Sequence, residues 1–131
     1  MLNKVINTII TITILFLCLS VLTLSTGKDA RADVPENQVA EVNHLINFVK
    51  TSDCVLNRNG TDHSGEKSVA HIQKKYNYFR NKIKSTEDFI EYSATKSTMS
   101  GKYYTVTCPG QETVRSQDWL LQELARFRSN Q

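Results

Sequence analysis

The chain has 131 residues, 22% of them charged, and this length allows one domain of the usual size of about 150 residues but not two. Five Gly and two Pro exclude a collagen-like or proline-rich chain, while five Tyr, five Phe and one Trp exclude a disordered acidic tail. Of the net charge of +3, residues 1–32 carry three basic and one acidic side chain, so residues 33–131 are nearly neutral and we expect no nucleic-acid partner.

The N-terminal segment predicts export. Its residues 5–24 form a run of twenty without charge, flanked by basic residues. Twenty helical residues span about 30 Å, enough to cross a bilayer, so length alone permits a retained anchor as well as a signal peptide. Ala30-Arg31-Ala32 is the small-x-small pattern that precedes signal-peptidase cleavage. We therefore expect residues 1–32 to be a signal peptide, retained as a membrane anchor in the alternative, and the remainder to be periplasmic or secreted.

The cysteines predict one disulfide. Cys18 lies inside the leader, which leaves Cys54 and Cys108 in the exported part. An even pair in an oxidising compartment favours a bridge over a metal or redox site. No Cys-x-x-Cys motif is present, which argues against a thioredoxin-like role.

Residues 33–50 predict the first helix. Asp33 offers an N-cap, and Pro35 and Glu36 favour the first turn. At ~100° per residue the apolar positions fall on one arc, with His44 pointing the other way. The members of this arc are Val39, Val42, Leu45, Ile46 and Val49.

Two further helices follow a short strand. Residues 54–58 are compatible with a strand, and Asn59-Gly60 supplies turn residues that tolerate positive φ. A helix then begins near Ser64, and the next is capped by Ser85 or Thr86. The expected buried positions are Val69, Ile72, Tyr76, Phe79 and Ile83 on the first of these helices and Phe89 and Ile90 on the second.

The C-terminal part predicts a strand and a last helix. Residues 103–108 are β-branched and aromatic, and Pro109-Gly110 ends the strand. Ser116 is the expected cap of the helix. Its apolar side consists of Leu120, Leu121, Leu124 and Phe127.

The disulfide and the two strands together fix a register. A bridge from Cys54 to Cys108 requires antiparallel strands at this register. The residue numbers of each opposing pair then add up to 162, as 54 and 108 do. Leu56 then lies opposite Val106, and Arg58 lies opposite Tyr104, with Arg58 stacked on the Tyr104 ring. The expected fold is α+β, with about four helices and a two-stranded antiparallel ribbon tied by one disulfide.

Several spaced motifs resemble those of an uncharacterised bacterial family typified by the small secreted protein YfeK. The matching residues are Cys54, Arg58-Asn59-Gly60, His63, Ala70-His71-Ile72, Thr86-Glu87-Asp88-Phe89-Ile90, Ser97, Ser100-Gly101, Tyr104, Cys108, Gly110 and Trp119-Leu120. The resemblance implies a bacterial envelope setting and gives no activity, substrate or cofactor. One departure is Tyr103, which stands where the family pattern has proline.

The leading hypothesis is a non-enzymatic binding or interaction module for a polar or anionic ligand or an envelope partner. An arginine, an aromatic ring and exposed amides at one strand end suit such a group. The candidate binding residues are Arg58, Asn59, Gly60, His63, His71 and Tyr104.

Other interpretations stay open or are disfavoured. A small hydrolase or lyase would use His63 or His71 as general base, with Asp62 or Glu66 orienting it. A third hypothesis is a purely structural envelope component. The two histidines are eight residues apart, which does not suit a zinc clamp on one helix, so we expect no metal and no cofactor. We interpret the basic run Lys74, Lys75, Arg80, Lys82 and Lys84 as a solvated helix face.

Overall fold

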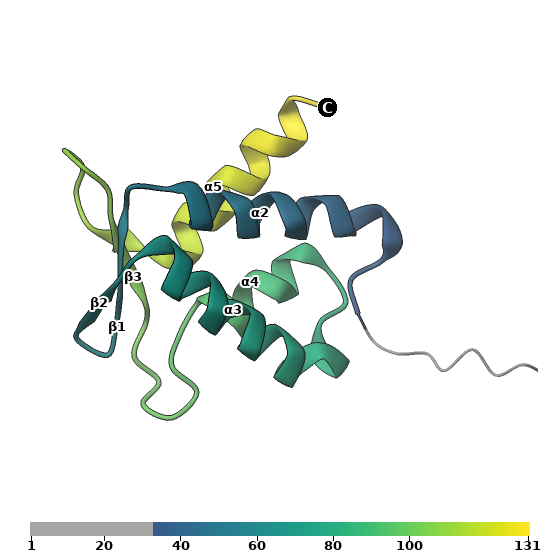
Figure 1. The fold of residues 1–131 in the computed structure, drawn as a ribbon. Helices are drawn as coiled ribbons and strands as arrows, with labels where there is room; N and C mark the ends of the chain where they lie inside the picture. The colour runs from purple at the N-terminus through teal and green to yellow at the C-terminus, as the bar shows by residue number, and fades with distance from the viewer. Residues whose placement is uncertain (1–32) are drawn as a thin grey trace, which may run out of the picture. The chain divides into compact units, whose positions relative to one another are not determined.

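Helices make up most of the fold that the computed structural model describes, which covers residues 33–131 (Figure 1). The predicted signal peptide, with Cys18 and the cleavage site after Ala32, lies outside the described residues and stays a prediction. The 3₁₀ turn η1 leads into the first α-helix, and η2 follows the second. The bounds are η1 Glu36–Gln38, α2 Val39–Thr51, α3 Gly65–Phe79, η2 Arg80–Lys82, α4 Thr86–Ala94 and α5 Ser116–Ser129.

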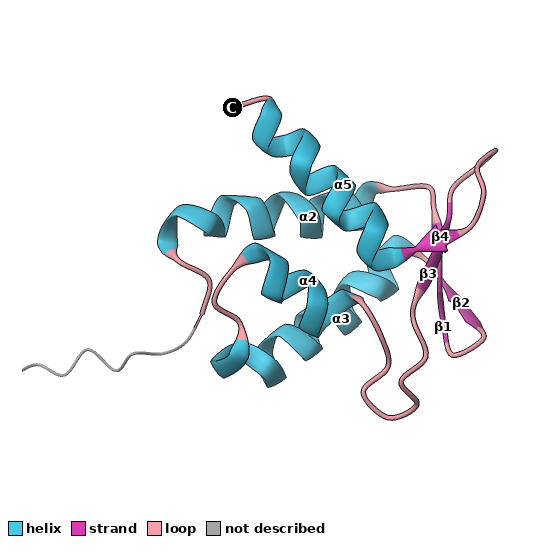
Figure 2. Ribbon diagram, turned by 180° about the vertical axis from the view of Figure 1, so that it is seen from behind, coloured by secondary structure: helices cyan, strands magenta, loops and turns pink. Residues whose placement is uncertain are grey.

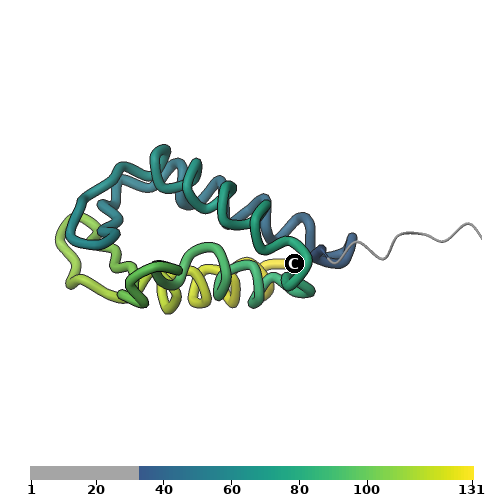
Figure 3. The backbone as a smooth tube through the Cα atoms, turned by 90° about the horizontal axis from the view of Figure 1, so that it is seen from below, coloured from purple at the N-terminus to yellow at the C-terminus, as the bar shows by residue number. Residues whose placement is uncertain are grey.

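The helices form two layers, with α2 beside α3 in one and α4 beside α5 in the other (Figure 3). Buried side chains from all four helices form one hydrophobic core between the layers, and they include Leu45, Ile72, Phe89 and Leu120. The α+β class and the four predicted helices are thus confirmed for residues 33–131. None of these helices has the length and apolar content needed to span a bilayer.

The burial of three side chains differs from the expectation. For His44 the reason is that α2 contacts all three other helices. His44 was expected to point away from the core, but helix α5 covers that side. The His44 ring stacks on Phe127 at 4.1 Å between centroids, and its Nε2 lies 2.5 Å from Glu123 Oε1. Val39 and Leu121, which were expected to be buried, are exposed.

The caps of the helices are partly as predicted. Ser64 and Ser85 accept hydrogen bonds from backbone amides in the first turns of α3 and α4. Asp33 does not cap a helix. Its carboxylate instead bonds the Tyr76 hydroxyl and the Arg80 guanidinium, and so ties the start of the described chain to α3 and η2.

A four-stranded antiparallel sheet lies at one end of the helices, in the order β2-β1-β3-β4 (Figure 2). The predicted pairing and register of the two central strands are confirmed, because Leu56 lies opposite Val106. The predicted two-stranded ribbon is therefore extended by a strand on each side. The bounds are β1 Val55–Arg58, β2 Thr61–His63, β3 Thr105–Thr107 and β4 Val114–Arg115.

The Asn59-Gly60 turn creates the extra pairing with β2. Both residues have positive φ, 53° at Asn59 and 84° at Gly60, as two-residue hairpin turns of the primed type require. Arg58 therefore pairs with Thr61 in the β1–β2 ladder. The β1–β3 ladder ends one residue earlier, because the backbone of Tyr104 bonds Thr95 and Ser116 instead. Ser116, the expected cap, is instead the first residue of α5, which begins directly after β4, and Arg115 stands at the N-cap position.

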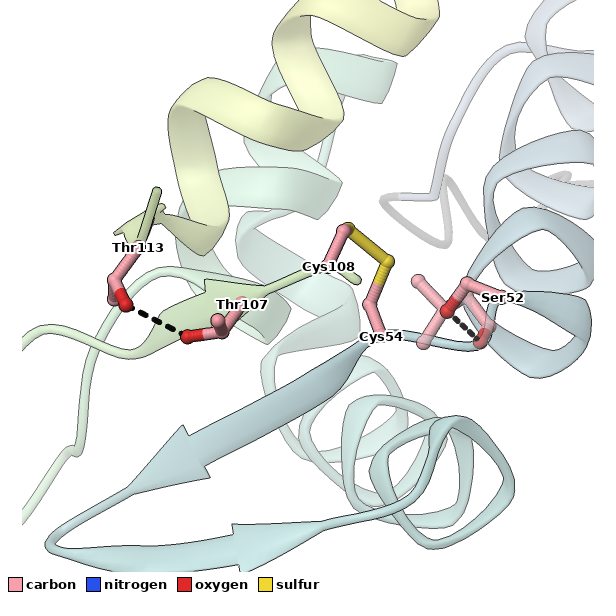
Figure 4. Close-up of a disulfide and its surroundings, with 6 residues drawn as sticks. Ser52, Cys54, Thr107, Cys108 and Thr113 are labelled. Carbon is pink, nitrogen blue, oxygen red and sulfur yellow. Dashed lines mark hydrogen bonds between the residues drawn. A yellow bond between two sulfur atoms is a disulfide. The ribbon is translucent and has the colours of Figure 1, made fainter. Parts of the chain in front are cut away.

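The predicted disulfide joins the ends of the two central strands (Figure 4). Cys54 precedes β1 and Cys108 follows β3, so the bridge continues the register of the ladder. Arg58 stands at the opposite end of β1. The disulfide and the Asn59-Gly60 turn thus hold β1 from its two ends.

Candidate functional site

A buried tyrosine and three basic side chains lie together where the sheet meets the helices. We call Arg58, His71, Lys75 and Tyr104 the Tyr104 cluster. Arg58 is the last residue of β1, Tyr104 directly precedes β3, and His71 and Lys75 lie one turn apart on α3. Period-2 alternation puts Arg58 on the same face of β1 as the buried Leu56, which is the face toward the helices.

Tyr104 is the centre of this cluster. Only 5% of it is exposed, and its hydroxyl lies 3.1 Å from His71 Nε2. The His71 ring meets the Tyr104 ring edge-on, and the Lys75 ammonium lies over the Tyr104 ring at 5.3 Å from its centroid. The expected stacking of Arg58 on Tyr104 is therefore not what the structure has, since the cation over this ring comes from α3.

Lys75 is the residue of the cluster whose exposure to solvent was predicted wrongly. It was interpreted as part of a solvated face, but it is 9% exposed. The segment after α4 folds over this side of α3, and the Lys75 Nζ donates to the Lys96 carbonyl at 2.6 Å. A bridge between Lys96 and Tyr103 closes that segment. No local pattern marks Lys75 as buried, because the covering segment is distant in sequence.

The cluster carries positive charge that no carboxylate within residues 33–131 neutralises by direct contact. Arg58, His71 and Lys75 take part in none of the ion pairs between described residues. The Nε of Arg58 is buried and has no hydrogen-bond partner in the described part of the chain. A buried guanidinium nitrogen without a partner is rare, because its desolvation is then uncompensated.

The pKa shifts report the same environment. Burial, followed by the charges of Arg58 and Lys75, lowers the pKa of His71 to about 4, so this imidazole is neutral at pH 7. Burial also lowers the pKa values of Arg58 and Lys75. Burial raises the pKa of Tyr104, although Arg58 opposes this shift. Every charged group here is thus held in a site that disfavours positive charge.

The depressed pKa of His71 predicts an acid-sensitive fold. Between about pH 6.5 and about pH 4 the imidazole is protonated in the unfolded chain and neutral in the folded one. The unfolded state then binds more protons, so the free energy of unfolding falls as the pH falls through this window. We expect the fall in the free energy of unfolding across this pH window to be smaller in His71→Gln than in the wild type, by on the order of 2 kcal/mol. Urea unfolding at several pH values measures this difference.

The less buried His63 supplies the matched control for that titration. Burial is also the main cause that lowers the pKa of His63, but this imidazole is more exposed than that of His71. His63→Gln should therefore change the acid dependence less than His71→Gln does. Equal acid slopes in the wild type and His71→Gln would contradict the assigned state of His71.

The remaining predicted site residues hold the turn in place. Asn59 Nδ2 donates to Ser97 Oγ at 3.4 Å, and Asn59 Oδ1 accepts from Ser100 Oγ at 2.7 Å. The Gly60 amide donates to Asn57 Oδ1. The two Asn59 bonds join the hairpin to the segment that covers Lys75, whereas the Gly60 bond lies within the hairpin. His63 lies at the end of β2, near enough to Arg58 for that charge to lower its pKa.

The geometry does not supply the imidazole and carboxylate pair of the general-base hypothesis. Within the described chain His71 bonds Tyr104, and neither His63 nor His71 contacts Asp62 or Glu66. Asp62 accepts from Asn57 instead, at 2.7 Å. Residues 33–131 also contain no group of three or more His, Cys, Asp or Glu side chains placed to hold one metal ion.

The chain is similar to proteins of unknown function. A family model described as "Family of unknown function (DUF5329)" matches residues 36–128. The "Uncharacterized protein YfeK" of Salmonella typhimurium is 33% identical over 86 residues, which cover 65% of this chain and 72% of that protein. No solved structure matches the chain.

Proposed function

The chain belongs to the DUF5329 family, whose function is unknown, and we propose that it is a non-enzymatic module that binds an anionic group at the Tyr104 cluster. The anion is a carboxylate or a phosphate on a small molecule or on an envelope partner. Arg58 is the residue that holds it, and Lys75 adds positive potential.

One observation carries this proposal: Arg58 has a buried Nε without a hydrogen-bond partner in residues 33–131. Arg58 as a whole is half-buried, but a buried donor left without an acceptor still costs about 1 to 3 kcal/mol. An anion at this position would accept from Arg58 and offset the repulsion among the cations around it. The other groups of the cluster do not provide such an acceptor charge, because His71 is neutral and Lys75 is a cation.

The side-chain type favours a carboxylate or phosphate over other ligands. The guanidinium presents its donors in a planar fork that matches two oxygens of such a group, and these charge-assisted bonds are among the stronger ones in proteins. The hydroxyl of Tyr104 and the Nε2 of His71 stand beside the fork as neutral polar groups. The site thus combines charge with a fixed orientation, as binding sites do.

The same proposal places the protein in the bacterial envelope. The support is the apolar run at residues 5–24 with its cleavage pattern, together with two cysteines that lie within bonding distance. Disulfides persist in oxidising compartments and are rare in the cytosol. An N-terminal sequencing experiment on the exported protein tests this part, since we expect it to begin at Asp33.

Binding of inorganic phosphate and of acetate tests the site. At constant ionic strength, either anion should raise the melting temperature of the wild-type protein, because a ligand of the native state stabilises it. We expect Arg58→Met to lower the affinity for the preferred anion at least about tenfold. This variant keeps the apolar stem and removes the buried Nε that has no partner, so it should fold at least as well as the wild type.

Arg115→Met is the matched control. Arg115 is also an arginine on the sheet, but it is exposed on β4 and lies over the Tyr103 ring at 4.1 Å. It should leave anion affinity unchanged. An equal loss in both variants would mean that only general charge matters, and no anion-dependent stabilisation of the wild type would refute the proposal.

A further inference from the structure

A cavity of about 320 Å³ opens beside the Tyr104 cluster, on the other side of Lys75. Its walls come from α3, α4 and the segment after α4. They are formed mainly by Lys75, Phe79, Glu91, Tyr92, Ser97 and Gly101. This volume lies at the lower end of the range of about 300 to 1,000 Å³ for small-molecule sites.

The ammonium of Lys75 has hydrogen-bonding capacity left for a ligand in this cavity. An ammonium has three donors, and Lys75 uses one of them on the Lys96 carbonyl. No other acceptor for its Nζ lies within residues 33–131, where its further neighbours are the faces of Phe79 and Tyr104. A lysine that is 9% exposed with two open donors is unusual, because lysines are rarely buried unless paired.

The acidic residue of the cavity is already engaged. Glu91 accepts from Gln117 at 2.8 Å, and its other oxygen lies 3.8 Å from the Lys96 ammonium. Against the effect of burial, the charge of Glu91 also raises the pKa of Lys75. Lys75, Lys96 and Glu91 together therefore leave one net positive charge in the cavity. One negative charge on a ligand would neutralise it, whereas a dianion would exceed it.

The aromatic walls of the cavity favour a ligand with an apolar part. The rings of Phe79 and Tyr92 lie 5.6 Å apart between centroids and are tilted by 33°, and both pack against the hydrophobic core. They present apolar surface a few ångströms from a cation. Such a combination suits a molecule with one charged end and one apolar end.

We infer that this cavity binds a small organic monocarboxylate, with the carboxylate on Lys75 and the apolar body on Phe79 and Tyr92. The cavity shares Lys75 with the Tyr104 cluster, but Arg58 does not line it, and the inference does not rest on the function proposed for Arg58. Benzoate is the probe, since it has one carboxylate and an apolar ring. Benzyl alcohol keeps the ring without the charge, and acetate keeps the charge without the ring.

Titrations followed by ¹⁵N-edited NMR test the inference. We expect benzoate to bind with a dissociation constant of about 1 mM or tighter and to shift the amide signals around Lys75, Phe79 and Tyr92. Lys75→Met should weaken benzoate binding at least about tenfold, because methionine suits the apolar surroundings but has no donor. Lys74→Met changes an exposed lysine on the same helix and should have no effect.

Three results would overturn the inference. Benzyl alcohol that shifts the signals around the cavity as tightly as benzoate does would remove the role of Lys75. Acetate that shifts the same signals as tightly in the Arg58→Met protein would remove the role of the rings. A titration of the wild type in which benzoate shifts only amide signals far from the cavity would also overturn the inference. This result does not depend on whether Lys75→Met folds. Arg58→Met should keep its affinity for benzoate, so that a failure here is distinct from a failure of the anion site proposed for Arg58.

Discussion

Replacing Cys54 and Cys108 together by alanine should lower the free energy of unfolding by about 4 kcal/mol. The two cysteines are 54 residues apart, so the bridge removes a large share of the conformational freedom of the unfolded chain. For a domain of this size the total stability is about 5 to 15 kcal/mol, so the double variant should lose a large share of its stability. Urea unfolding followed by circular dichroism measures the change.

Reduction of the wild-type protein provides the control for that substitution. Dithiothreitol opens the bridge without changing a side chain, and the reduced protein should show the same loss as the double variant. A loss of less than about 1 kcal/mol in both experiments would contradict the assigned role of the bridge. Anion affinity of the molecules that remain folded should change little, because Arg58 lies at the end of β1 away from Cys54.

The register of the central strands could be predicted because the disulfide and the positions of the apolar residues indicate the same register. A bridge between Cys54 and Cys108 leaves one antiparallel register, and that register places Leu56 and Val106 on the buried face, as the structure has them. The resemblance to the YfeK family is confirmed by the 33% identity to a YfeK protein over 86 residues. Cysteine spacing was therefore the most informative feature of the sequence.

The outer strands could not be predicted from their own residues. Strand β2 has three polar residues and β4 has two residues, so neither shows the alternation of apolar and polar positions that marks a strand. They form because the Asn59-Gly60 turn and the chain before Ser116 bring them beside a strand that already exists. Their pairing is a consequence of the tertiary structure.

The candidate site was predicted in its residue types more than in its contacts. Arg58, His71 and Tyr104 were identified from the sequence, and the structure brings all three together. The burial of Lys75 depends on a segment about twenty residues further along the chain, and helical periodicity carries no information on such a contact. The amides of Asn59 and Gly60 have structural partners that only the folded hairpin provides.

Gly65→Ala should destabilise the protein by about 3 kcal/mol, although alanine is the better helix former by about 1 kcal/mol. Gly65 is the first residue of α3, and a Cβ there would lie 2.1 Å from the Val49 carbonyl oxygen and 3.1 Å from that of Lys50. Both atoms belong to the backbone of α2, which cannot move aside as a flexible side chain would. The two helices must therefore separate, and this cost exceeds the gain in helix propensity.

Lys67→Ala separates this contact from a general effect on the helix. Lys67 is exposed in the same first turn of α3, so its replacement should change the stability by less than about 0.5 kcal/mol. Because α3 also carries His71 and Lys75, displacement of its first turn in Gly65→Ala should shift the amide signals around Tyr104, and NMR measures this together with urea unfolding. A Gly65→Ala protein as stable as the wild type, with unchanged signals at Tyr104, would show that α2 does not fix the position of α3 and of the two site residues that it carries, His71 and Lys75.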